Sequence, residues 1–451
     1  MKAATVVGGV IETFLGASPP MRITCWDDST WGDETAGFTV HVRSPDALRR
    51  LLWDPNELGL GRAYVAGDIE VDGSIFELFD LRDRITERID SDASLNLSRR
   101  QQLDLARDAW RLGVLGRRPA PPPEEAKLRG RLHSIRRDKE AITHHYDVGN
   151  DFYRLVLGPT MTYSCAFFAT DSTTLEQAQT LKHDHICRKL ALEPGQRLLD
   201  VGCGWGSMAI HAAREYGVEV VAVTISDEQA DLARERVRHA GLDDRVEIRI
   251  QDYREVDDGP FDAISSIGMF EHVGAERTRV YFQQLKGLLK PGGRLMNHAI
   301  SRTEGEGELE RDSFPARYVF PDGQLHEVGR TVSLLQDEGF ECRDVESLRE
   351  HYAQTLRCWV RNLEEHWDEA VRLVGPGRAR VWRLYMAGSA VGFEGHRLNI
   401  HQVLAVQPHA SGDSGMPRTR PDTVTEVDRV DTVADIDLRS GHDHALSADI
   451  A

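Results

Sequence analysis

The stretch LLDVGCGWG, from Leu198 to Gly206, ends an apolar run and places glycine at every second position of the loop that follows. Because glycine has no Cβ, its backbone can approach a ligand that lies over the start of the next helix. In an open α/β sheet, ligands bind outside the carboxyl ends of the strands, which is the position of this loop. The stretch therefore predicts a strand, a ligand-binding loop and a helix within an α/β fold.

The surrounding segment, from Gly195 to Arg302, alternates strand and helix patterns. Apolar, β-rich runs are predicted at residues 197–202, 218–225, 246–252, 261–269 and 293–301, with a final candidate at 398–406. The clearest helix lies between Ser226, a typical N-cap, and Gly241, a typical C-terminal stop. Near-continuous apolar strands that alternate with helices favour a mostly parallel, Rossmann-like sheet with helices on both faces.

Changes in composition predict the domain boundaries. The run RRPAPPPEEAK, residues 117–127, contains four prolines within five residues and favours an extended linker. The segment from residue 409 onward holds nine acids against four bases without periodicity, which is typical of disorder. We predict a small N-terminal α+β module at 1–116, a Pro-rich linker with a basic amphipathic helix at 117–137, a catalytic domain at 138–408 and a disordered acidic tail at 409–451.

The bulk properties of the 451 residues exclude several classes of protein. A formal net charge of −18 argues against a dedicated nucleic-acid binder. The six cysteines include no CxxC pair, so the sequence predicts no metal site and no disulfide framework, which favours a reducing cytosol. No apolar run approaches the roughly 18 residues needed to span a bilayer. The N-terminal 20 residues, which Glu12 interrupts, indicate a local helix rather than a secretion signal.

The glycine loop indicates which cofactor to expect. Its pattern has Asp200 at the strand end and glycines at 202, 204 and 206, whereas dinucleotide loops have G-x-G-x-x-G. The D-x-G-x-G-x-G form resembles the S-adenosylmethionine loop of class I methyltransferases, which implies that Asp200, Gly202, Gly204 and Gly206 bind the amino-acid end of that cofactor. A nucleotide-binding oxidoreductase loop, or a turn that only packs helix on sheet, stays open as an alternative.

Residues after the second and third strands are candidates for the rest of the cofactor site. An acid usually holds the ribose hydroxyls after the second strand, but here VTISDEQ offers Thr224 and Gln229 instead. After the third strand, Gln251, Asp252 and Tyr253 are candidates for the adenine pocket. Asp252 fits a plain loop acid equally well.

Motifs over about Asp138 to Val406 are shared with one family. They are HYDVGNDFYRLVLGPTMTYSCAFF (145–168), LLDVGCGWGSMA, VTISDEQ, QDYRE, SIGMFEHVG, VFPDG (319–323) and HYAQTL (351–356). Together they resemble the cyclopropane-fatty-acyl-phospholipid synthases and the related mycolic acid cyclopropane synthases. The first block and MFEHVG are the most specific, since a generic methyltransferase shares only the glycine loop. The N-terminal module also resembles the smaller domain of this family.

The resemblance implies a reaction and a catalytic cluster. In this family a cis alkene attacks the methyl of S-adenosylmethionine, and a bound bicarbonate ion removes a proton so that a cyclopropane ring closes. Carried over by motif, the bicarbonate site consists of Cys165, Glu271, His298, Tyr352 and the backbone amide of Ile300. By themselves, Cys165 fits a small buried hydrophobe, His298 a core histidine and Tyr352 a helix cap.

The resemblance implies further roles around the cofactor. Tyr163 and Ser164 are expected at its carboxylate end, and His272 is expected to support the turn next to Glu271. Tyr146, Asn150 and Phe152 are expected to form a lid, although ordinary helix packing also accounts for them.

Two positions depart from the family pattern. Ser389 stands where some members have a cysteine, which puts in doubt any mechanism with a nucleophile there. His326 and Glu327 follow the FPDG block where Pro and Ser are usual, so the acyl length or the product could differ.

A phospholipid substrate would require contact with a membrane surface. Residues 127–139, KLRGRLHSIRRDK, place Leu128, Leu132 and Ile135 among the basic residues Arg129, Arg131, Arg136, Arg137 and Lys139, which is typical of a helix on an anionic leaflet or of a solvated connector. We therefore expect a cytoplasmic protein, peripheral on the inner face of the membrane. The resemblance further implies homodimerisation through the N-terminal module.

Three alternatives to a cyclopropane product remain open. Proton loss from an adjacent carbon would give a methylene branch, which a partner reductase would convert to a methyl branch. A methyltransferase for a soluble small molecule would share the glycine loop. A catalytically silent cofactor-binding scaffold would be favoured by a broken cluster, but all its side-chain members are present.

Overall fold

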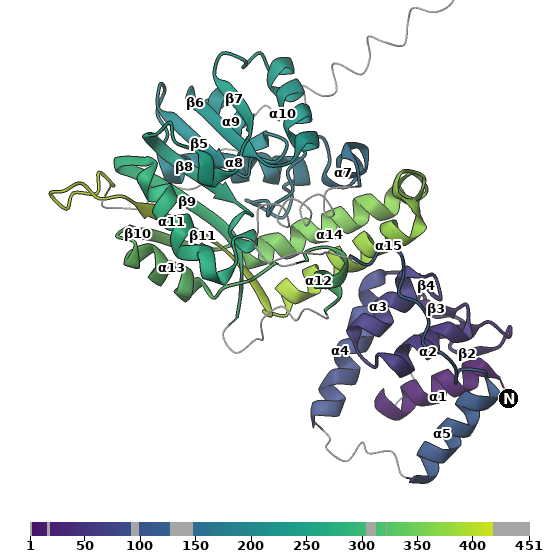
Figure 1. Ribbon diagram of the computed structural model, residues 1–451. Helices are drawn as coiled ribbons and strands as arrows, with labels where there is room; N and C mark the ends of the chain where they lie inside the picture. Colours follow the sequence, from purple (N-terminus) through teal and green to yellow (C-terminus); the bar gives the residue numbers. More distant parts are fainter. Residues whose placement is uncertain are drawn as a thin grey trace, which may run out of the picture. The chain divides into compact units, whose positions relative to one another are not determined.

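The computed structural model describes residues 2–15, 19–91, 99–126, 148–303, 313–321 and 323–417 (Figure 1). The chain forms two compact units. The first comprises Met1–Lys127, Arg311–Val319 and Trp367–Val391, and the second comprises Leu128–Glu310, Phe320–His366 and Gly392–Ala451.

A seven-stranded sheet organises the described residues of the second unit, in the order β10-β11-β9-β8-β5-β6-β7. The strands are β5 (Arg197–Val201), β6 (Glu219–Thr224), β7 (Val246–Ile250), β8 (Phe261–Ile267), β9 (Leu289–Arg302), β10 (Glu341–Ser347) and β11 (Leu398–Val406). Neighbours from β9 through β7 pair in parallel, whereas β11 is antiparallel to both β9 and β10. This confirms the predicted mostly parallel sheet of a class I methyltransferase fold.

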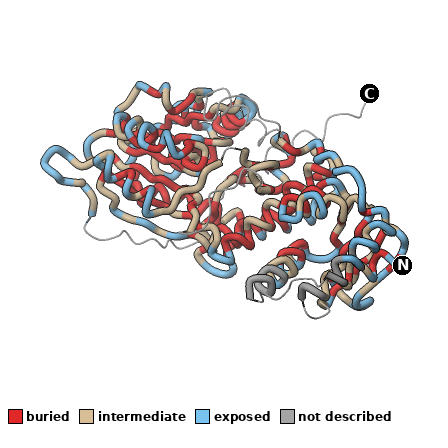
Figure 2. The backbone as a smooth tube through the Cα atoms, turned by 60° about the horizontal axis from the view of Figure 1, so that its bottom comes forward, coloured by how far each residue is buried: buried red, intermediate tan, exposed pale blue. Residues whose placement is uncertain are grey.

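Helices cover both faces of this sheet (Figure 1). The α-helices of the second unit are α7 (Asn150–Leu157), α8 (Leu175–Leu190), α9 (Ser207–Tyr216), α10 (Asp227–His239), α11 (Thr278–Gly287), α13 (Val328–Asp337) and α14 (Arg349–Glu365). Short 3-10 helices are η1 (Tyr253–Glu255), η2 (Phe270–His272) and η3 (Ala275–Arg277). Leu198 packs in the core under α8, α9 and α10, and its neighbour Leu199 packs under α11 and α13. Buried positions therefore dominate β5, β6, β8 and β11, and Figure 2 draws buried residues in red.

The ends of α10 follow from its sequence. The Ser226 side chain accepts a hydrogen bond from the backbone N–H of Gln229, and Gly241 has a φ of +66° just after the helix. Both features match the predicted cap and stop. The helix covers the strands that carry Thr224 and Ile250 at their carboxyl ends, so its capped N-terminus sits at the edge where the cofactor loops meet.

The first unit contains a four-stranded sheet among its described residues, in the order β2-β1-β3-β4. Its strands are β1 (Arg22–Cys25), β2 (Thr30–Gly32), β3 (Thr39–Val42) and β4 (Ile69–Asp72). Its helices are α1 (Ala3–Leu15), α2 (Pro45–Trp53), α3 (Glu57–Val65), α4 (Ile75–Ser91), α5 (Arg99–Arg111), α12 (Phe314–Tyr318) and most of α15 (Trp367–Glu394). An α+β module was predicted here, and the local helix predicted at the N-terminus is α1.

The compact units do not follow the boundaries predicted from composition. Residues 311–319 and 367–391 were placed in the catalytic domain, but they group with the N-terminal module. Within the first unit Phe314 packs against Gly61, and the Arg380 side chain donates to Glu70. These contacts join segments about 250 to 310 residues apart, and no change in composition signals them.

The C-terminal tail was predicted to be disordered from residue 409, and its first residues contradict this. The backbone N–H of His409 donates to Asp413, and Arg294 donates to the carbonyl of Gly415. Met416 packs against the core of the second unit. Residues 418–451 lie outside the described residues, as do the predicted basic helix at 127–139 and Tyr146.

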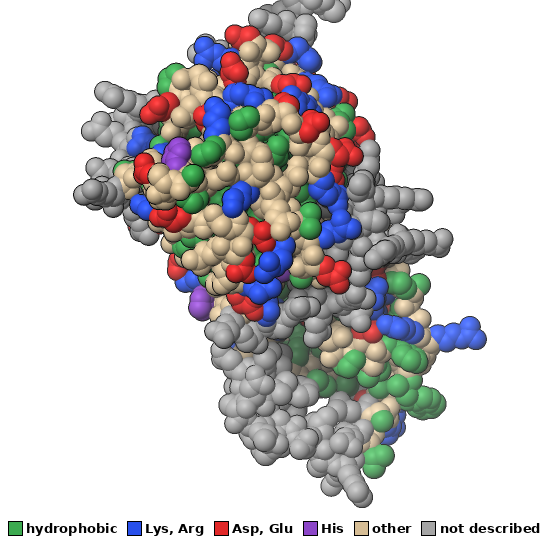
Figure 3. Space-filling model, turned by 60° about the vertical axis from the view of Figure 1, so that its left-hand side comes forward, with side chains coloured by type: hydrophobic (Ala, Val, Ile, Leu, Met, Phe, Trp, Pro, Cys, Tyr) green, Lys and Arg blue, Asp and Glu red, His purple; other side chains and the backbone are tan. Residues whose placement is uncertain are grey.

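The surface and the helices bear on the predicted membrane contact. Acidic and basic side chains are interspersed over the face shown in Figure 3. None of the helices in the described part of the chain combines the length and the apolar composition required to cross a bilayer.

Candidate active site

The glycine loop closes over the carboxyl end of β5 through its own backbone. The N–H groups of Gly202 and Cys203 both donate to the carbonyl of Val223 on β6, at 3.0 Å. Gly202, Gly204 and Gly206 all have positive φ angles, of +77°, +55° and +80°. Glycine adopts this region without strain, whereas other L-residues rarely do. The sequence pattern is therefore required by the backbone path of the loop.

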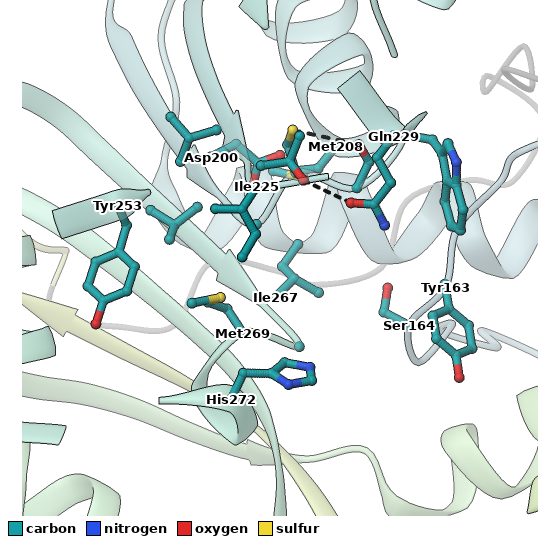
Figure 4. Close-up of a pocket in the computed structure, with 18 of the residues that line it drawn as sticks. Tyr163, Ser164, Asp200, Met208, Ile225, Gln229, Tyr253, Ile267, Met269 and His272 are labelled. Carbon is teal, nitrogen blue, oxygen red and sulfur yellow. Dashed lines mark hydrogen bonds between the residues drawn. The ribbon is translucent and has the colours of Figure 1, made fainter. Parts of the chain in front are cut away.

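A cavity lies beside this loop and contains most of the predicted cofactor residues (Figure 4). The predicted residues that line it are Tyr163, Ser164, Asp200, Gly202, Gly204, Thr224, Gln229, Gln251, Asp252 and Tyr253. They come from the ends of β5, β6 and β7 and from the segment between α7 and α8. The structure therefore brings predicted residues from four separate stretches of sequence to one cavity.

Gly206 is the exception among the predicted cofactor residues, because it does not line the cavity. It caps the N-terminus of α9, and a Cβ on it would lie 3.3 Å from the Cβ of Ala233 on α10. That distance is tighter than ordinary van der Waals contact. Gly206 thus serves close helix packing, which was the alternative considered for the loop.

Asp200 lines the cavity, and only one of its two carboxylate oxygens forms a hydrogen bond in the described residues. Its Oδ1 accepts a hydrogen bond from Ser265 at 2.7 Å, and its Oδ2 has no hydrogen-bond partner in the described residues. Burial raises the pKa of Asp200 to about 6. A buried carboxylate oxygen without a partner is costly unless a ligand satisfies it. The amino group of S-adenosylmethionine fits this position, so the site is compatible with the implied cofactor.

Thr224 and Gln229 replace the usual acid after the second strand. The Thr224 hydroxyl donates to Gln229 Oε1 at 2.8 Å. This bond fixes the glutamine, whose amide faces the open part of the cavity in Figure 4. The pair could bind ribose hydroxyls through neutral hydrogen bonds instead of a carboxylate.

Asp252 lines the cavity and also serves its own turn. Its carboxylate accepts from the backbone N–H and the side chain of Arg254, at 2.9 Å and 2.7 Å for Oδ1. It therefore caps η1, as expected of a loop acid, and it also lines the cavity, as expected of a residue of the adenine pocket. Next to it, Tyr253 packs edge-on against Tyr281, with ring centroids 5.2 Å apart.

The segment that carries Tyr163 and Ser164 is tied to the glycine loop by an arginine. Arg236, buried on α10, donates to the carbonyl oxygens of Trp205 at 2.7 Å and Thr160 at 3.0 Å. The Tyr163 ring lies 5.4 Å from that of Trp359. This arrangement positions both residues over the cavity, as Figure 4 shows.

Two of the predicted lid residues are described, and they pack in the second unit. Asn150, at the start of α7, accepts a hydrogen bond from the Trp205 indole at 2.8 Å. Phe152 is fully buried and contacts Tyr153 edge-on. Asn150 thus reaches the cofactor cavity through Trp205, whereas Phe152 belongs to the core.

The side chains of Glu271 and His272 point in different directions. His272 lines the cavity, whereas the Glu271 carboxylate turns toward β9 and accepts from the backbone N–H of Ile300 at 2.8 Å. Successive residues of a 3-10 helix point about 120° apart, which explains the difference. His272 was expected only to support the turn, and this expectation is corrected by its place in the cavity (Figure 4).

Burial governs the protonation of both residues. It raises the pKa of Glu271 to about 7 and lowers the pKa of His272 to about 4. His272 therefore faces the cavity as a neutral imidazole, while Glu271 can change its charge near neutral pH. Glu271 Oε2 has no hydrogen-bond partner in the described residues.

The other residues of the predicted cluster lie on β9, on α14 and in the segment between α7 and α8. His298 pairs across β9 and β11 with Gln402, whose amide nitrogen lies 3.1 Å from His298 Nδ1. When the Gln402 amide donates to Nδ1, the neutral ring carries its proton on Nε2, which has no partner in the described residues. Burial holds the pKa of His298 well below its usual range, so the ring is neutral.

The Cys165 thiol and the Tyr352 backbone N–H approach the same carbonyl oxygen at the start of α14. The Cys165 thiol lies 3.6 Å from the carbonyl of Leu348, and the backbone N–H of Tyr352 donates to the same carbonyl at 3.0 Å. Leu348 in turn donates to Ile400, which pairs with Ile300 across the sheet. Burial raises the pKa of Cys165 well above its usual range, so it remains a thiol.

This cluster is continuous through these contacts but does not line the cofactor cavity. Its described atoms without partners are a carboxylate oxygen of Glu271 and an N–H of His298. A small anion with both donor and acceptor oxygens would satisfy both atoms, so the residues fit the bicarbonate that the resemblance implies. The Ile300 amide, predicted as a further ligand, is taken by Glu271 itself, so the carboxylate would have to turn aside to free it.

Several residues of the site were not predicted from sequence. Lys182 and His183 on α8, Met269 beside η2, and Arg277 after it line the cavity together with His272. Ser389, which was expected to depart from the family pattern, belongs to the first unit. His326 and Glu327 lie beside the cluster, because Ser301 pairs with His326 and the neighbouring Gln324 donates to the carbonyl of Glu271.

Comparisons with known proteins show what this chain is similar to. A model of the family described as mycolic acid cyclopropane synthetase matches residues 133–403. A probable fatty acid methyltransferase of Mycobacterium tuberculosis is 45% identical over 90% of this chain and 96% of its own length. The cyclopropane-fatty-acyl-phospholipid synthase of Escherichia coli is 34% identical over 82% of this chain and 88% of its own. The crystal structure of mycolic acid cyclopropane synthase CmaA1 with SAH and CTAB aligns with a TM-score of 0.56 and 33% identity, over 59% of this chain and 97% of that one.

Proposed function

This chain belongs to the mycolic acid cyclopropane synthetase family, and from that premise we propose that it forms cyclopropane rings in the unsaturated acyl chains of membrane phospholipids. It is an S-adenosylmethionine-dependent methyltransferase of the kind that acts on lipid acyl chains. When bound, the cofactor supplies an electrophilic methyl group. The double bond of the acyl chain takes up this carbon, and loss of one proton from the resulting cation closes the ring.

The state of Glu271 is the observation that carries the proposal. Its buried carboxylate has one oxygen without a partner in the described residues, and its other oxygen accepts from the backbone N–H of Ile300, two residues along β9 from the neutral imidazole of His298. A carbocation needs a base nearby and no competing water or nucleophile. A carboxylate with a pKa of about 7 can accept a proton at neutral pH and return it to solvent later.

We propose that bicarbonate binds between Glu271 and His298 and carries the proton to the glutamate. Bound there, bicarbonate would supply a small mobile base close to the acyl chain. The Nε2–H of His298 can donate to it and Glu271 can accept from it, while Cys165, between α7 and α8, and Tyr352, on α14, are the further side chains expected at the site. Glu271 thereby orients the ion and holds the proton.

A methylene-branched product is the second candidate. The relative that is 45% identical carries the name of a fatty acid methyltransferase, whereas the synthase matches at 34%. Both products arise from the same cation and differ in the carbon that loses its proton. His326 and Glu327, which depart from the family pattern, lie beside Glu271 and could alter the position of the acyl chain. A methylene product would also require a reductase partner.

The proposed substrate implies a place in the cell. We propose a cytoplasmic protein that reversibly contacts the inner face of the membrane, supported by the basic amphipathic pattern of residues 127–139. We also propose a homodimer formed through the N-terminal module, for which the family resemblance is the support.

A product assay tests the proposed function. The protein would be incubated with S-adenosylmethionine and vesicles of cis-monounsaturated phospholipid, with and without bicarbonate, and the fatty acids analysed by proton NMR. We expect upfield ring protons, and a loss of most product when bicarbonate is removed. Vinylidene protons would establish the methylene branch instead. Absence of both products would indicate a soluble substrate, and equal yield without bicarbonate would contradict its role.

The pKa of Glu271 leads to a prediction for the pH dependence of turnover. Because burial raises this pKa to about 7, the carboxyl is neutral below that pH and a base above it. At saturating substrate and a fixed bicarbonate concentration, kcat should rise between about pH 6 and pH 8 with a midpoint near 7. Circular dichroism at each pH would control for unfolding. A flat profile over this range would remove Glu271 as the proton acceptor.

A further inference from the structure

A buried lysine without a counter-ion lies at the wall of the cofactor cavity. Lys182, in the middle of α8, is 1% exposed. Among the described residues, no carboxylate lies within ion-pair distance of its ammonium group. Its Nζ donates to the Ser164 hydroxyl at 3.0 Å and lies 3.4 Å from His183 Nδ1. Burying an ammonium group without an opposite charge is costly, so such a group is kept where a ligand completes it.

The surroundings of Lys182 show that its charge is only partly stabilised. Burial lowers its pKa to about 8, and the negative charge of nearby Asp200 acts in the opposite direction. In contrast, Lys189 on the same helix is also buried but forms ion pairs with Asp344 and Glu346, at 3.0 Å and 2.5 Å. The helix therefore carries one lysine whose charge is matched within the protein and one whose charge is not.

Lys182 and Asp200 line the same cavity with opposite charges. Asp200 has an oxygen without a partner, and Lys182 contacts Ser164, which lies on the cavity wall. A zwitterion with one ammonium and one carboxylate group is complementary to this pair. The amino-acid end of S-adenosylmethionine is such a zwitterion.

We infer that Lys182 is the residue that binds the carboxylate of the cofactor, with Ser164 holding the ammonium group in position and Asp200 receiving the amino group. The inference depends on the S-adenosylmethionine requirement and not on which lipid product is formed. It adds to the cofactor residues expected from the sequence motifs a buried cation next to Ser164.

The test compares two ligands that differ only in the carboxylate. S-adenosylmethionine and its decarboxylated analogue would be titrated into wild-type protein and Lys182→Met by isothermal calorimetry near pH 7. For Lys182→Met we expect affinity for S-adenosylmethionine to fall about 10- to 100-fold, as for loss of a charge-assisted hydrogen bond. Affinity for the decarboxylated analogue should change by less than about threefold. Equal losses for both ligands, or no loss for either, would overturn the inference.

Two further measurements separate ligand binding from a structural role. Without ligand, Lys182→Met should melt at the same or a higher temperature than the wild type, because a buried unpaired charge has been replaced by an apolar chain. A lower melting temperature together with equal losses would indicate a structural lysine. Lys182→Arg, which retains the charge, should recover part of the affinity for S-adenosylmethionine. If wild-type protein bound neither ligand, the cofactor assignment itself would fail instead.

Discussion

Replacing Glu271 by glutamine is expected to lower turnover about 10²- to 10⁴-fold, the usual range for loss of a general acid or base. Glutamine preserves the size of the side chain, and its carbonyl oxygen can still accept from the Ile300 N–H, as Glu271 does at 2.8 Å. It cannot accept a proton near pH 7. Since Glu271 does not line the cofactor cavity, affinity for S-adenosylmethionine should stay within about threefold of wild type.

The matched control for Glu271→Gln is the adjacent residue, His272. It is a neutral imidazole on the cavity wall, so His272→Gln should weaken cofactor binding more than it slows the chemical step. Single-turnover rates and calorimetric affinities for both variants would show this separation. Near-normal turnover of Glu271→Gln would exclude the carboxylate from the reaction. A large loss of cofactor affinity in that variant would mean that the two residues do not divide their roles as proposed.

The largest expected effect on stability concerns the buried ion pair of the first unit. Arg62 donates to both oxygens of Glu125, at 2.7 Å and 2.8 Å, and the two residues are 8% and 7% exposed. The Tyr318 hydroxyl also approaches Glu125, at 3.4 Å. Removal of one partner leaves a buried charge without compensation, which costs about 3 to 5 kcal/mol. Because Asp54 still pairs with Arg62, we expect Glu125→Gln to lower the free energy of unfolding of this unit by about 3 kcal/mol.

Scanning calorimetry would follow this change as a separate transition of the first unit. Arg62→Met combined with Glu125→Leu should recover much of the loss, because an apolar pair leaves no buried charge. The exposed pair of Arg279 and Asp337, at 2.7 Å, provides the reference: Asp337→Asn should change stability by less than about 1 kcal/mol. If Glu125→Gln behaved like Asp337→Asn, the buried pair would contribute no more than a surface pair.

Elements with a strong local pattern could be predicted from the sequence. The parallel strands β5 and β6 are mostly apolar on both faces, and α10 has its cap and stop residues at the observed positions. The edge strand β10 was missed, because ECRDVES has intermediate and exposed positions throughout and no apolar alternation. A polar edge strand is recognised only by its pairing with β11, which is a tertiary property.

Residues of the site could be predicted where a motif places them at the end of a strand. Lys182 could not, because it lies in TLKHDHICRKL, where a run of charged and polar residues usually indicates a solvated helix. In the structure α8 is buried on most of its surface, and Lys182, His183, His185 and Lys189 are all inside. Which of Glu271 and His272 lines the cavity depends on the orientation of the 3-10 helix η2, and the motif MFEHVG does not determine that orientation.

The three-segment makeup of the first unit has a consequence for biosynthesis. The first unit begins with residues 1–127, and the ribosome must add about 240 further residues before it reaches Trp367, where α15 begins. At about 5 to 20 residues per second, residues 1–127 wait roughly 10 to 50 s for the helix that supplies Arg380 to Glu70 and packs Gly388 against Phe79. During this interval the nascent N-terminal segment has an incomplete core, so it should be the part of the polypeptide that chaperones recognise. The second unit has the opposite order of assembly, because most of its parallel strands are translated consecutively and can pair as they emerge.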